Sequence, residues 1–332
     1  MSGGERKKIV VLGAGAFGTA LAAVLARAGH DVVLQGRDEA TLAAIAKTRR
    51  SAAYLGDIAL PETLATAALF DNAEAAAHLV LLATPAQTIG AMAEALASRG
   101  AAFGEAPVIL CAKGIDRGAG APLSTVFSSA LPDRAFGVLS GPSFATDLAR
   151  GLPTAVSLAA PTLADARSYA AAFAGSSLRV YASDDVRGVE LGGALKNVLA
   201  IGAGIVHGRG LGASAQAALV TRGLVEMRRL AVRLGARAET LNGLSGLGDL
   251  ILTCASEQSR NFAYGAAVGR GASREGLKLA EGVATADIAC ALAAEHGLDV
   301  PIMATVSAVL DERLTVDAAI AALMERPLNT EQ

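Results

Sequence analysis

A glycine-rich loop between two apolar segments constrains the fold of the first part of this chain. Residues 8–12 have the continuous apolar pattern of a buried strand, residues 18–28 have the Ala/Leu pattern of a helix, and residues 31–34 indicate a second strand. The loop after the first strand carries three glycines, Gly13, Gly15 and Gly18. Glycines at this spacing permit a tight turn, a close backbone approach to a pyrophosphate and close packing of the helix on the strand. The segment predicts a dinucleotide-binding βαβ unit, with a purely structural tight turn as the alternative.

The end of the second predicted strand bears on which dinucleotide binds. An acidic side chain there hydrogen-bonds the ribose 2′-hydroxyl of NAD, whereas an arginine accommodates the 2′-phosphate of NADP. Arg37 occupies this place and is followed by Asp38 and Glu39. We expect NADP to be preferred, with NAD as the other cofactor. The alternative is that the two acids pair with Arg37 as a surface feature.

The N-terminus also imitates a secretory signal, because Arg6, Lys7 and Lys8 precede an apolar run. We interpret this run as part of the fold, since removing it would delete the first strand of the βαβ unit. Other apolar runs are interrupted by proline, glycine or charge before they reach the roughly 20 residues that span a membrane. We therefore expect no membrane insertion.

Charge and cysteine content narrow the classes of partner. The formal net charge of −2 gives no overall basic field, so neither nucleic acid nor an anionic membrane is an expected partner. The three cysteines lie far apart and form no metal-ligand pattern. Reduced thiols of this kind fit a cytoplasmic protein without a metal.

Strand and helix patterns then divide the chain in two. The length of 332 residues favours about two domains. Strand patterns recur between Ala-rich helical stretches at residues 67–70, 79–83, 108–111, 136–139, 155–159 and 178–181. Afterwards only helical patterns follow, at residues 186–207, 214–235, 249–255, 260–269, 284–296, 302–311 and 316–325. The predicted fold class is α/β, with an N-terminal Rossmann-type, doubly wound, mostly parallel sheet followed by an all-α C-terminal domain. We place the dinucleotide-binding domain at residues 1–184 and a helical substrate domain at residues 185–332, where Asp184 and Asp185 have the character of a helix cap.

One helical segment, residues 189–206, places Lys196 and Asn197 in an otherwise apolar, glycine-rich background. Apolar side chains point in nearly every direction around a helix here, so the helix should be buried on most sides. Burying an unpaired ammonium costs several kcal/mol, so a buried lysine normally has a carboxylate partner or a chemical task. The alternative is that Lys196 reaches solvent from the helix edge.

Further polar motifs stand out at places where ligands bind in such folds. Thr84, Lys113 and the segment 140–144 directly follow predicted strands, and ligands bind at the carboxyl ends of parallel strands. In the second half, Asp249 and the segment 259–261 interrupt an apolar background. Each has an ordinary alternative, because Asp249 has the position of a helix N-cap and residues 259–261 have the composition of a solvated loop.

Together these motifs resemble one family, the bacterial-type NAD(P)-dependent glycerol-3-phosphate dehydrogenases. The resemblance covers nearly the whole chain, with motifs in family order: Gly13-Ala-Gly-Ala-Phe-Gly18, Ala112-Lys-Gly114, Ser140-Gly-Pro-Ser-Phe-Ala145, Leu195-Lys-Asn-Val198, Ala217-Ala-Leu-Val-Thr-Arg-Gly223, Gly246-Leu-Gly-Asp-Leu250, Ser259-Arg-Asn261 and Glu281-Gly282. It implies reversible hydride transfer between a nicotinamide and dihydroxyacetone phosphate, a small phosphorylated substrate, giving sn-glycerol 3-phosphate for phospholipid synthesis. A homodimer is a further implication.

The resemblance also assigns residues to roles. Lys196 corresponds to the general acid/base, and Asp249 to the carboxylate that orients it or balances its charge. The matches to substrate contacts are Lys113, Gly141, Ser143, Lys196, Asn197, Asp249, Thr253, Ser259, Arg260 and Asn261. The matches to cofactor contacts are Gly13, Gly15, Ala16, Phe17, Gly18, Arg37, Lys113, Ala145, Arg260, Leu279 and Glu281.

Some positions depart from the family pattern. Phe17 and Gln35 lie where tryptophan is common, residues 210–214 have an unusual sequence, and residues 50–61 lack the usual motif, so Tyr54 receives no role. The nearest alternative function is another lysine-using Rossmann reductase, for a 3-hydroxy acid or ketopantoate, whose substrate anion would be a carboxylate.

Overall fold

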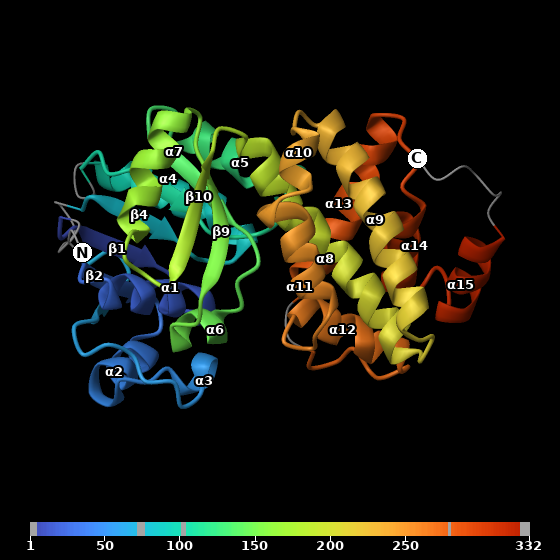
Figure 1. Ribbon diagram of the computed structural model, residues 1–332, viewed down its shortest axis with the longest axis horizontal. Helices are drawn as coiled ribbons and strands as arrows, with labels where there is room; N and C mark the ends of the chain where they lie inside the picture. The colour runs from blue at the N-terminus through green and yellow to red at the C-terminus, as the bar shows by residue number, and fades with distance from the viewer. Residues whose placement is uncertain (1–4, 72–76, 101–103, 278–279, 326–332) are drawn as a thin grey trace.

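The first half of the protein is built on a twisted sheet, seen at the left of Figure 1. The computed structural model describes residues 5–71, 77–100, 104–277 and 280–325. Its eight-stranded sheet has the order β10-β9-β8-β5-β4-β1-β2-β3. The strands are β1 (Lys8–Leu12), β2 (Asp31–Gly36), β3 (Ala65–Ala68), β4 (Leu79–Leu82), β5 (Val108–Leu110), β8 (Phe136–Ser140), β9 (Thr154–Ala159) and β10 (Leu178–Ser183). Neighbours are parallel except β8 and β9, so the predicted mostly parallel sheet is confirmed.

Helices cover both faces of this sheet. They are α1 (Ala16–Arg27), α2 (Glu39–Thr48), α3 (Ala52–Leu55), α4 (Ile89–Arg99), α5 (Leu123–Ala130), α6 (Ala145–Arg150) and α7 (Leu163–Ala170). Successive side chains of a strand point to opposite faces, and β1 shows this directly. Ile9 and Val11 join the apolar cluster of α1 and α6, whereas Val10 and Leu12 join that of α4 and α5. The segment that imitates a signal sequence is thus a central strand with its helix.

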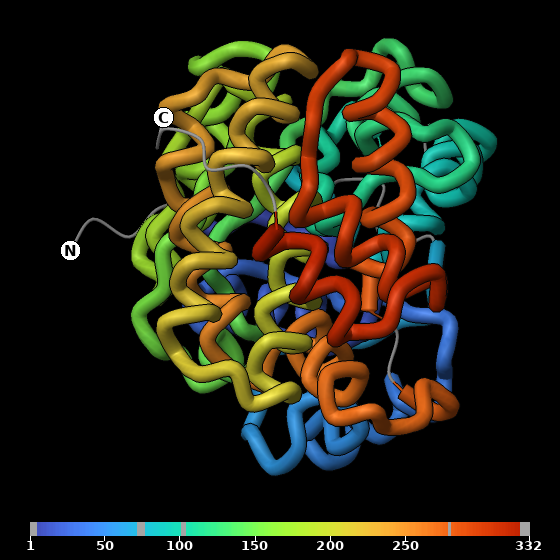
Figure 2. Tube along the Cα trace, turned by 90° about the vertical axis from the view of Figure 1, so that its right-hand side faces the viewer, coloured from blue at the N-terminus to red at the C-terminus, as the bar shows by residue number. Residues whose placement is uncertain are grey.

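The second half is helical and surrounds one long helix (Figure 1). The helices are α8 (Val186–Gly208), α9 (Ala213–Arg233), α10 (Ala238–Leu241), α11 (Asp249–Cys254), α12 (Arg260–Gly269), α13 (Glu281–Glu295), α14 (Pro301–Leu310) and α15 (Val316–Met324), and a π-helical turn spans Leu244–Gly248. Asp185 caps α8 by accepting the Gly188 N–H at 2.8 Å, as its position predicted. Figure 2 looks onto this half, with the sheet region behind it.

Helix α8 is the centre of the helical half and packs against α9, α11, α12, α13 and α14. It is long and apolar enough to cross a membrane, yet its most apolar stretch is wholly buried inside the protein. Its low amphipathicity follows from this position, since a helix covered on all sides needs no polar face. The expectation that residues 189–206 are buried on most sides is confirmed.

Glycines bring α8 and α12 into backbone contact. Gly204 and Gly208 on α8 face Gly265 and Gly269 on α12, and a Cβ added at any of the four would overlap backbone atoms of the other helix. Small residues four positions apart let two helices approach this closely. The contact fixes the start of α12, where Arg260 lies, relative to α8.

We expect Gly265→Ala to destabilise the protein by about 1–3 kcal/mol, because its Cβ would lie 2.8 Å from the carbonyl carbon of Ile201. Urea unfolding measures the loss. Gly90→Ala in α4 is the control: among the described residues its Cβ would meet only Val126 Cγ1, at 3.3 Å, so its stability should stay within about 1 kcal/mol of the wild type. Equal stabilities of the two variants would contradict this account of the helix contact.

Candidate active site

The glycine loop after β1 has the geometry that a dinucleotide requires. Gly13 has φ +118°, and a Cβ there would lie 2.6 Å from the carbonyl oxygen of Ala83. Helix α1 begins at Ala16 without a side-chain cap, and a Cβ on Gly15 would meet no atom within 4 Å. First-turn N–H groups beside open space suit a phosphate. Thr84 Oγ1, in the loop after β4, is buried and has no hydrogen-bond partner among the described residues.

These features fit a bound dinucleotide. Gly13, Gly15, Ala16, Phe17 and Gly18 lie in this loop and the first turn of α1, which begins two residues earlier than predicted. A merely structural turn would not need the open space at Gly15 or the uncapped helix start.

Arg37 lies exposed directly after β2. Its neighbour Asp38 caps α2, accepting the Thr41 N–H at 3.2 Å and the Thr41 hydroxyl at 2.5 Å. The Thr41 hydrogen bonds lower the pKa of Asp38. The Asp38 carboxylate is therefore committed to a helix cap, and the guanidinium remains available for a nucleotide.

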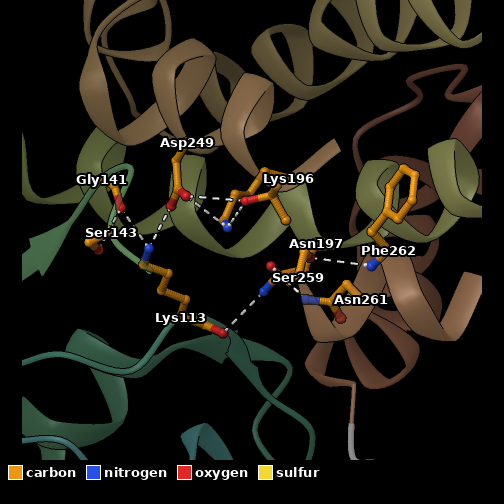
Figure 3. Close-up of polar contacts among 10 residues, drawn as sticks. Lys113, Gly141, Ser143, Lys196, Asn197, Asp249, Ser259, Asn261 and Phe262 are labelled. Carbon is orange, nitrogen blue, oxygen red and sulfur yellow. Dashed lines mark hydrogen bonds and ion pairs between the residues drawn. The ribbon is translucent and has the colours of Figure 1, made fainter. Parts of the chain in front are cut away.

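Lys196 is buried in the middle of α8, and its ammonium is held from α11 (Figure 3). Its Nζ lies 2.9 Å from Asp249 Oδ1 and donates to Thr253 Oγ1 at 2.6 Å. Since the residue is only 5% exposed, the alternative that Lys196 reaches solvent is wrong. The partner that burial demands is the Asp249 carboxylate.

Asp249 serves two lysines. Its Oδ2 accepts from Lys113 Nζ at 2.6 Å, which reaches across from the loop after β5. The N-cap interpretation of Asp249 is wrong: Gly248 is the N-cap of α11, and the Asp249 side chain, 1% exposed, turns to the two ammoniums. A helix start needs no carboxylate cap here because the π-helical turn Leu244–Gly248 leads directly into α11.

Burial lowers the pKa of Lys196 to about 8, opposed by the attraction of Asp249 and assisted by the repulsion of Lys113. An ammonium with this pKa exchanges its proton close to neutral pH, which is the property of a general acid or base. Burial raises the pKa of the neighbouring Cys254 thiol to about 12, so that thiol stays protonated.

The loops after β5 and β8 meet at Lys113. Its Nζ also donates to the Gly141 carbonyl at 2.8 Å, and Ser143 donates its hydroxyl to the same carbonyl at 2.9 Å. Both loops lie at the carboxyl ends of their strands. Lys113, Gly141 and Ser143 thus lie together beside Asp249, the partner of Lys196 (Figure 3).

An amide chain extends the site toward α12 and α13 (Figure 3). Asn261 donates to Asn197 Oδ1 at 3.0 Å and accepts the Gly282 N–H at 2.9 Å, while Asn197 donates to the Lys113 carbonyl at 3.4 Å. Ser259 Oγ caps α12 by accepting the Phe262 N–H at 3.3 Å. The segment 259–261 is therefore a helix start beside Lys196, and its interpretation as a solvated loop is wrong.

Arg260 and Glu281, two further residues predicted to contact ligands, flank this run of amide hydrogen bonds. Arg260 is exposed at the start of α12, and its charge interacts with that of Glu281 at the start of α13. Burial raises the pKa of Glu281, whose Oε1 accepts the Ala86 N–H at 3.4 Å, so this side chain links α13 to the sheet region. Ala145 is the first residue of α6, and Leu279 lies outside the described residues.

Glu190 and the direct link between Lys113 and Asp249 were not predicted from the sequence. Glu190 lies in the same apolar segment as Lys196 and is 4% exposed, yet it contacts Ser124 of α5 rather than the lysine. The signal was present, because an acid flanked by Val189 and Leu191 in a buried helix needs a partner as much as a lysine does.

Fold and site together define a class, the nicotinamide-dependent oxidoreductases. The nucleotide loop after β1 and the Lys113 loop after β5 lie at the same edge of the sheet, and Lys113 reaches the carboxylate that holds the buried Lys196. Comparison with known sequences narrows this class. Residues 8–166 match the family description "NAD-dependent glycerol-3-phosphate dehydrogenase N-terminus", and residues 185–321 match its C-terminus. The chain belongs to the NAD-dependent glycerol-3-phosphate dehydrogenase family.

Individual relatives agree. A protein of Mesorhizobium japonicum named glycerol-3-phosphate dehydrogenase (NAD(P)+) is 54% identical over 98% of this chain and 94% of its own length. The protein of the same name from Brucella ovis is 51% identical over 98% of this chain and 99% of its own length. The crystal structure of glycerol-3-phosphate dehydrogenase from Coxiella burnetii is 36% identical, with a TM-score of 0.90 over 97% of this chain and 99% of that chain.

We expect Asp249→Ala to cost about 3–5 kcal/mol of unfolding free energy, because the buried Lys196 and the half-buried Lys113 lose their shared carboxylate. Urea denaturation at neutral pH measures it. The control is Asp317→Ala, whose ion pair with Arg209 is exposed and should contribute less than about 1 kcal/mol. Losses of similar size in both variants would show that Asp249 does not hold the two lysines together.

Proposed function

We propose that the protein catalyses the reversible reduction of dihydroxyacetone phosphate to sn-glycerol 3-phosphate with NADPH, in the cytoplasm, for glycerophospholipid synthesis. The observation that carries the proposal is the buried Lys196, whose ammonium is oriented by Asp249 and Thr253 beside the sheet edge where the nucleotide loop lies. Membership of the family supports the substrate.

Lys196 acts as the proton donor. A bound nicotinamide supplies the hydride, and the ketone oxygen that gains negative charge then needs a proton within hydrogen-bond reach. Lys196 Nζ has two fixed acceptors, Asp249 and Thr253, so its remaining hydrogen has a defined direction. Such a donor contributes roughly 100- to 10,000-fold in rate. In the reverse direction the neutral amine takes the proton from the alcohol.

Cationic groups from both halves hold the substrate. Arg260 offers a two-pronged donor to the phosphate at the N-terminus of α12, where the helix dipole also favours an anion. Ser259, Asn261 and Asn197 lie near it in the helical half, and Lys113, Gly141 and Ser143 come from the sheet region. We propose that residues 1–184 and residues 185–332 form two domains. A substrate held between these domains is shielded from water during hydride transfer.

Arg37 favours NADP over NAD, because its exposed guanidinium is not paired with the Asp38 cap. The loop residues Gly13, Gly15, Ala16, Phe17 and Gly18 take the pyrophosphate side, and Lys113, Ala145, Arg260, Leu279 and Glu281 complete the proposed cofactor contacts. A homodimer also remains a prediction.

A substrate and cofactor panel tests the function. Purified protein should oxidise NADPH with dihydroxyacetone phosphate and show little turnover of 3-hydroxy acids or ketopantoate. NADPH should be preferred to NADH, and Arg37→Gln should raise the KM for NADPH while leaving that for NADH nearly unchanged, since it removes only the 2′-phosphate partner. Normal turnover of a carboxylate substrate with none of the triose phosphate would favour the alternative reductase.

The two directions of the reaction should have opposite pH dependences. Reduction needs the ammonium of Lys196, so its kcat/KM should fall as pH rises through the pKa of about 8, whereas oxidation of glycerol 3-phosphate needs the amine and should rise there. Initial rates across the pH range measure both.

Lys196→Met should abolish both activities while NADPH binding, followed by fluorescence, persists. Undiminished turnover by this variant would remove Lys196 from the chemistry.

A further inference from the structure

A row of α8 side chains faces a hairpin of the sheet region. Glu190, Ala194 and Asn197 follow the i, i+4, i+7 spacing that places residues on one helix face. Asn197 donates to the carbonyl of Lys113, and Ala194 shares an apolar cluster with Ile115, which is completely buried. This face of α8 thus lies along the segment that runs from Lys113 to Ile115 and onward.

The hairpin connects the active site to the start of α5. It consists of β6 (Ile115–Asp116) and β7 (Ala121–Pro122), paired antiparallel with Ile115 opposite Pro122. Lys113 lies just before β6, and α5 begins at Leu123, directly after β7. A shift of the α5 N-terminus therefore moves the hairpin and the loop that carries Lys113.

Glu190 caps α5 from the neighbouring helix. The N-cap of α5 is Pro122, which offers no side-chain hydrogen bond. Instead Glu190 Oε1 accepts the Ser124 N–H at 2.7 Å, and Oε2 accepts the Ser124 hydroxyl at 2.6 Å. A carboxylate at a helix N-terminus satisfies exposed N–H groups and the helix dipole. Because Glu190 is buried, water does not replace these bonds.

We propose that Glu190 is a positioning residue for the reaction: by capping α5 it holds the β6–β7 hairpin against α8 and so keeps Lys113 on Asp249, next to Lys196. The inference rests on the proposed function of these two lysines. Helix α8 then has two roles. It carries the proton donor Lys196, and through Glu190 it anchors the loop that carries Lys113.

A loosened hairpin has a defined electrostatic consequence. The charged and titratable groups around Lys196 are Lys113, Asp249, Cys254 and Glu281. Lys113 lowers the pKa of Lys196 by repulsion and shares its counter-ion. When Lys113 withdraws, the repulsion weakens and Asp249 serves Lys196 alone, so the pKa of Lys196 rises.

The test compares Glu190→Gln with the wild type in the reduction of dihydroxyacetone phosphate. Glutamine keeps the shape but offers one acceptor instead of two, so the cap weakens. We expect kcat to fall roughly 10- to 100-fold, because small misplacements of catalytic groups have effects of this size. The KM for NADPH should stay nearly unchanged, and the alkaline limb of the pH profile should move to higher pH.

A second variant and a matched control separate positioning from stability. Ser124→Ala removes one of the two bonds and should shift kcat and the alkaline limb in the same direction by less, and it decides the question if Glu190→Gln does not fold. Glu226 of α9 caps α14 in the same way, accepting the N–H groups of Ile302 at 2.9 Å and Met303 at 3.1 Å. Glu226→Gln should lower the melting temperature comparably and leave kcat and the pH profile unchanged.

The outcomes distinguish this inference from the proposed function. If Glu190→Gln and Ser124→Ala lose only stability, as Glu226→Gln should, Glu190 is structural and the inference is wrong, while the wild-type activity stands. If the wild type does not reduce the triose phosphate, the proposed function itself fails.

Discussion

One buried carboxylate between two ammoniums is the interaction on which the site depends. Asp249 contacts Lys196 from its own half of the protein and Lys113 from the other half, so a single side chain joins the sheet region to the helical region. The desolvation penalty of such groups is large, and it is tolerable only while the pairs stay intact. Burial, assisted by the repulsion of Lys113, lowers the pKa of Lys196 to about 8 against the attraction of Asp249. Cohesion and the proposed proton transfer therefore share one set of atoms.

Helix α8 fixes the geometry of this interaction. Its apolar residues occupy the middle of the helical half, and its glycines let α12 approach to backbone contact. Its buried side chains Glu190, Lys196 and Asn197 each hydrogen-bond a residue outside α8. Lys196, Asn197 and Glu190 thus have their positions set by packing on all sides rather than by loops. This arrangement suits proton transfer, which requires a donor held within a narrow range of distances.

Much of the fold could be predicted because its signals are local. The βαβ unit followed from three glycines between apolar runs, and long helices such as α8, α9 and α12 followed from their periodicity. Short elements did not: the β6–β7 hairpin has two residues per strand and α10 has four, too few to show a period. Lys196 and Asp249 were found as anomalies in apolar surroundings. The bond from Lys113 to Asp249 and the cap formed by Glu190 were not, since each joins residues far apart in sequence and depends on how the two halves pack.

The glycine contact between α8 and α12 affects how the active site unfolds. Lys196 lies on one of these helices and Arg260 begins the other, and their backbones touch inside the largest apolar cluster of the helical half. Regions that open locally at low cost have few buried contacts, and this region has many. Lys196 and the start of α12 therefore stay together while this core persists, and their separation coincides with cooperative unfolding of the helical half.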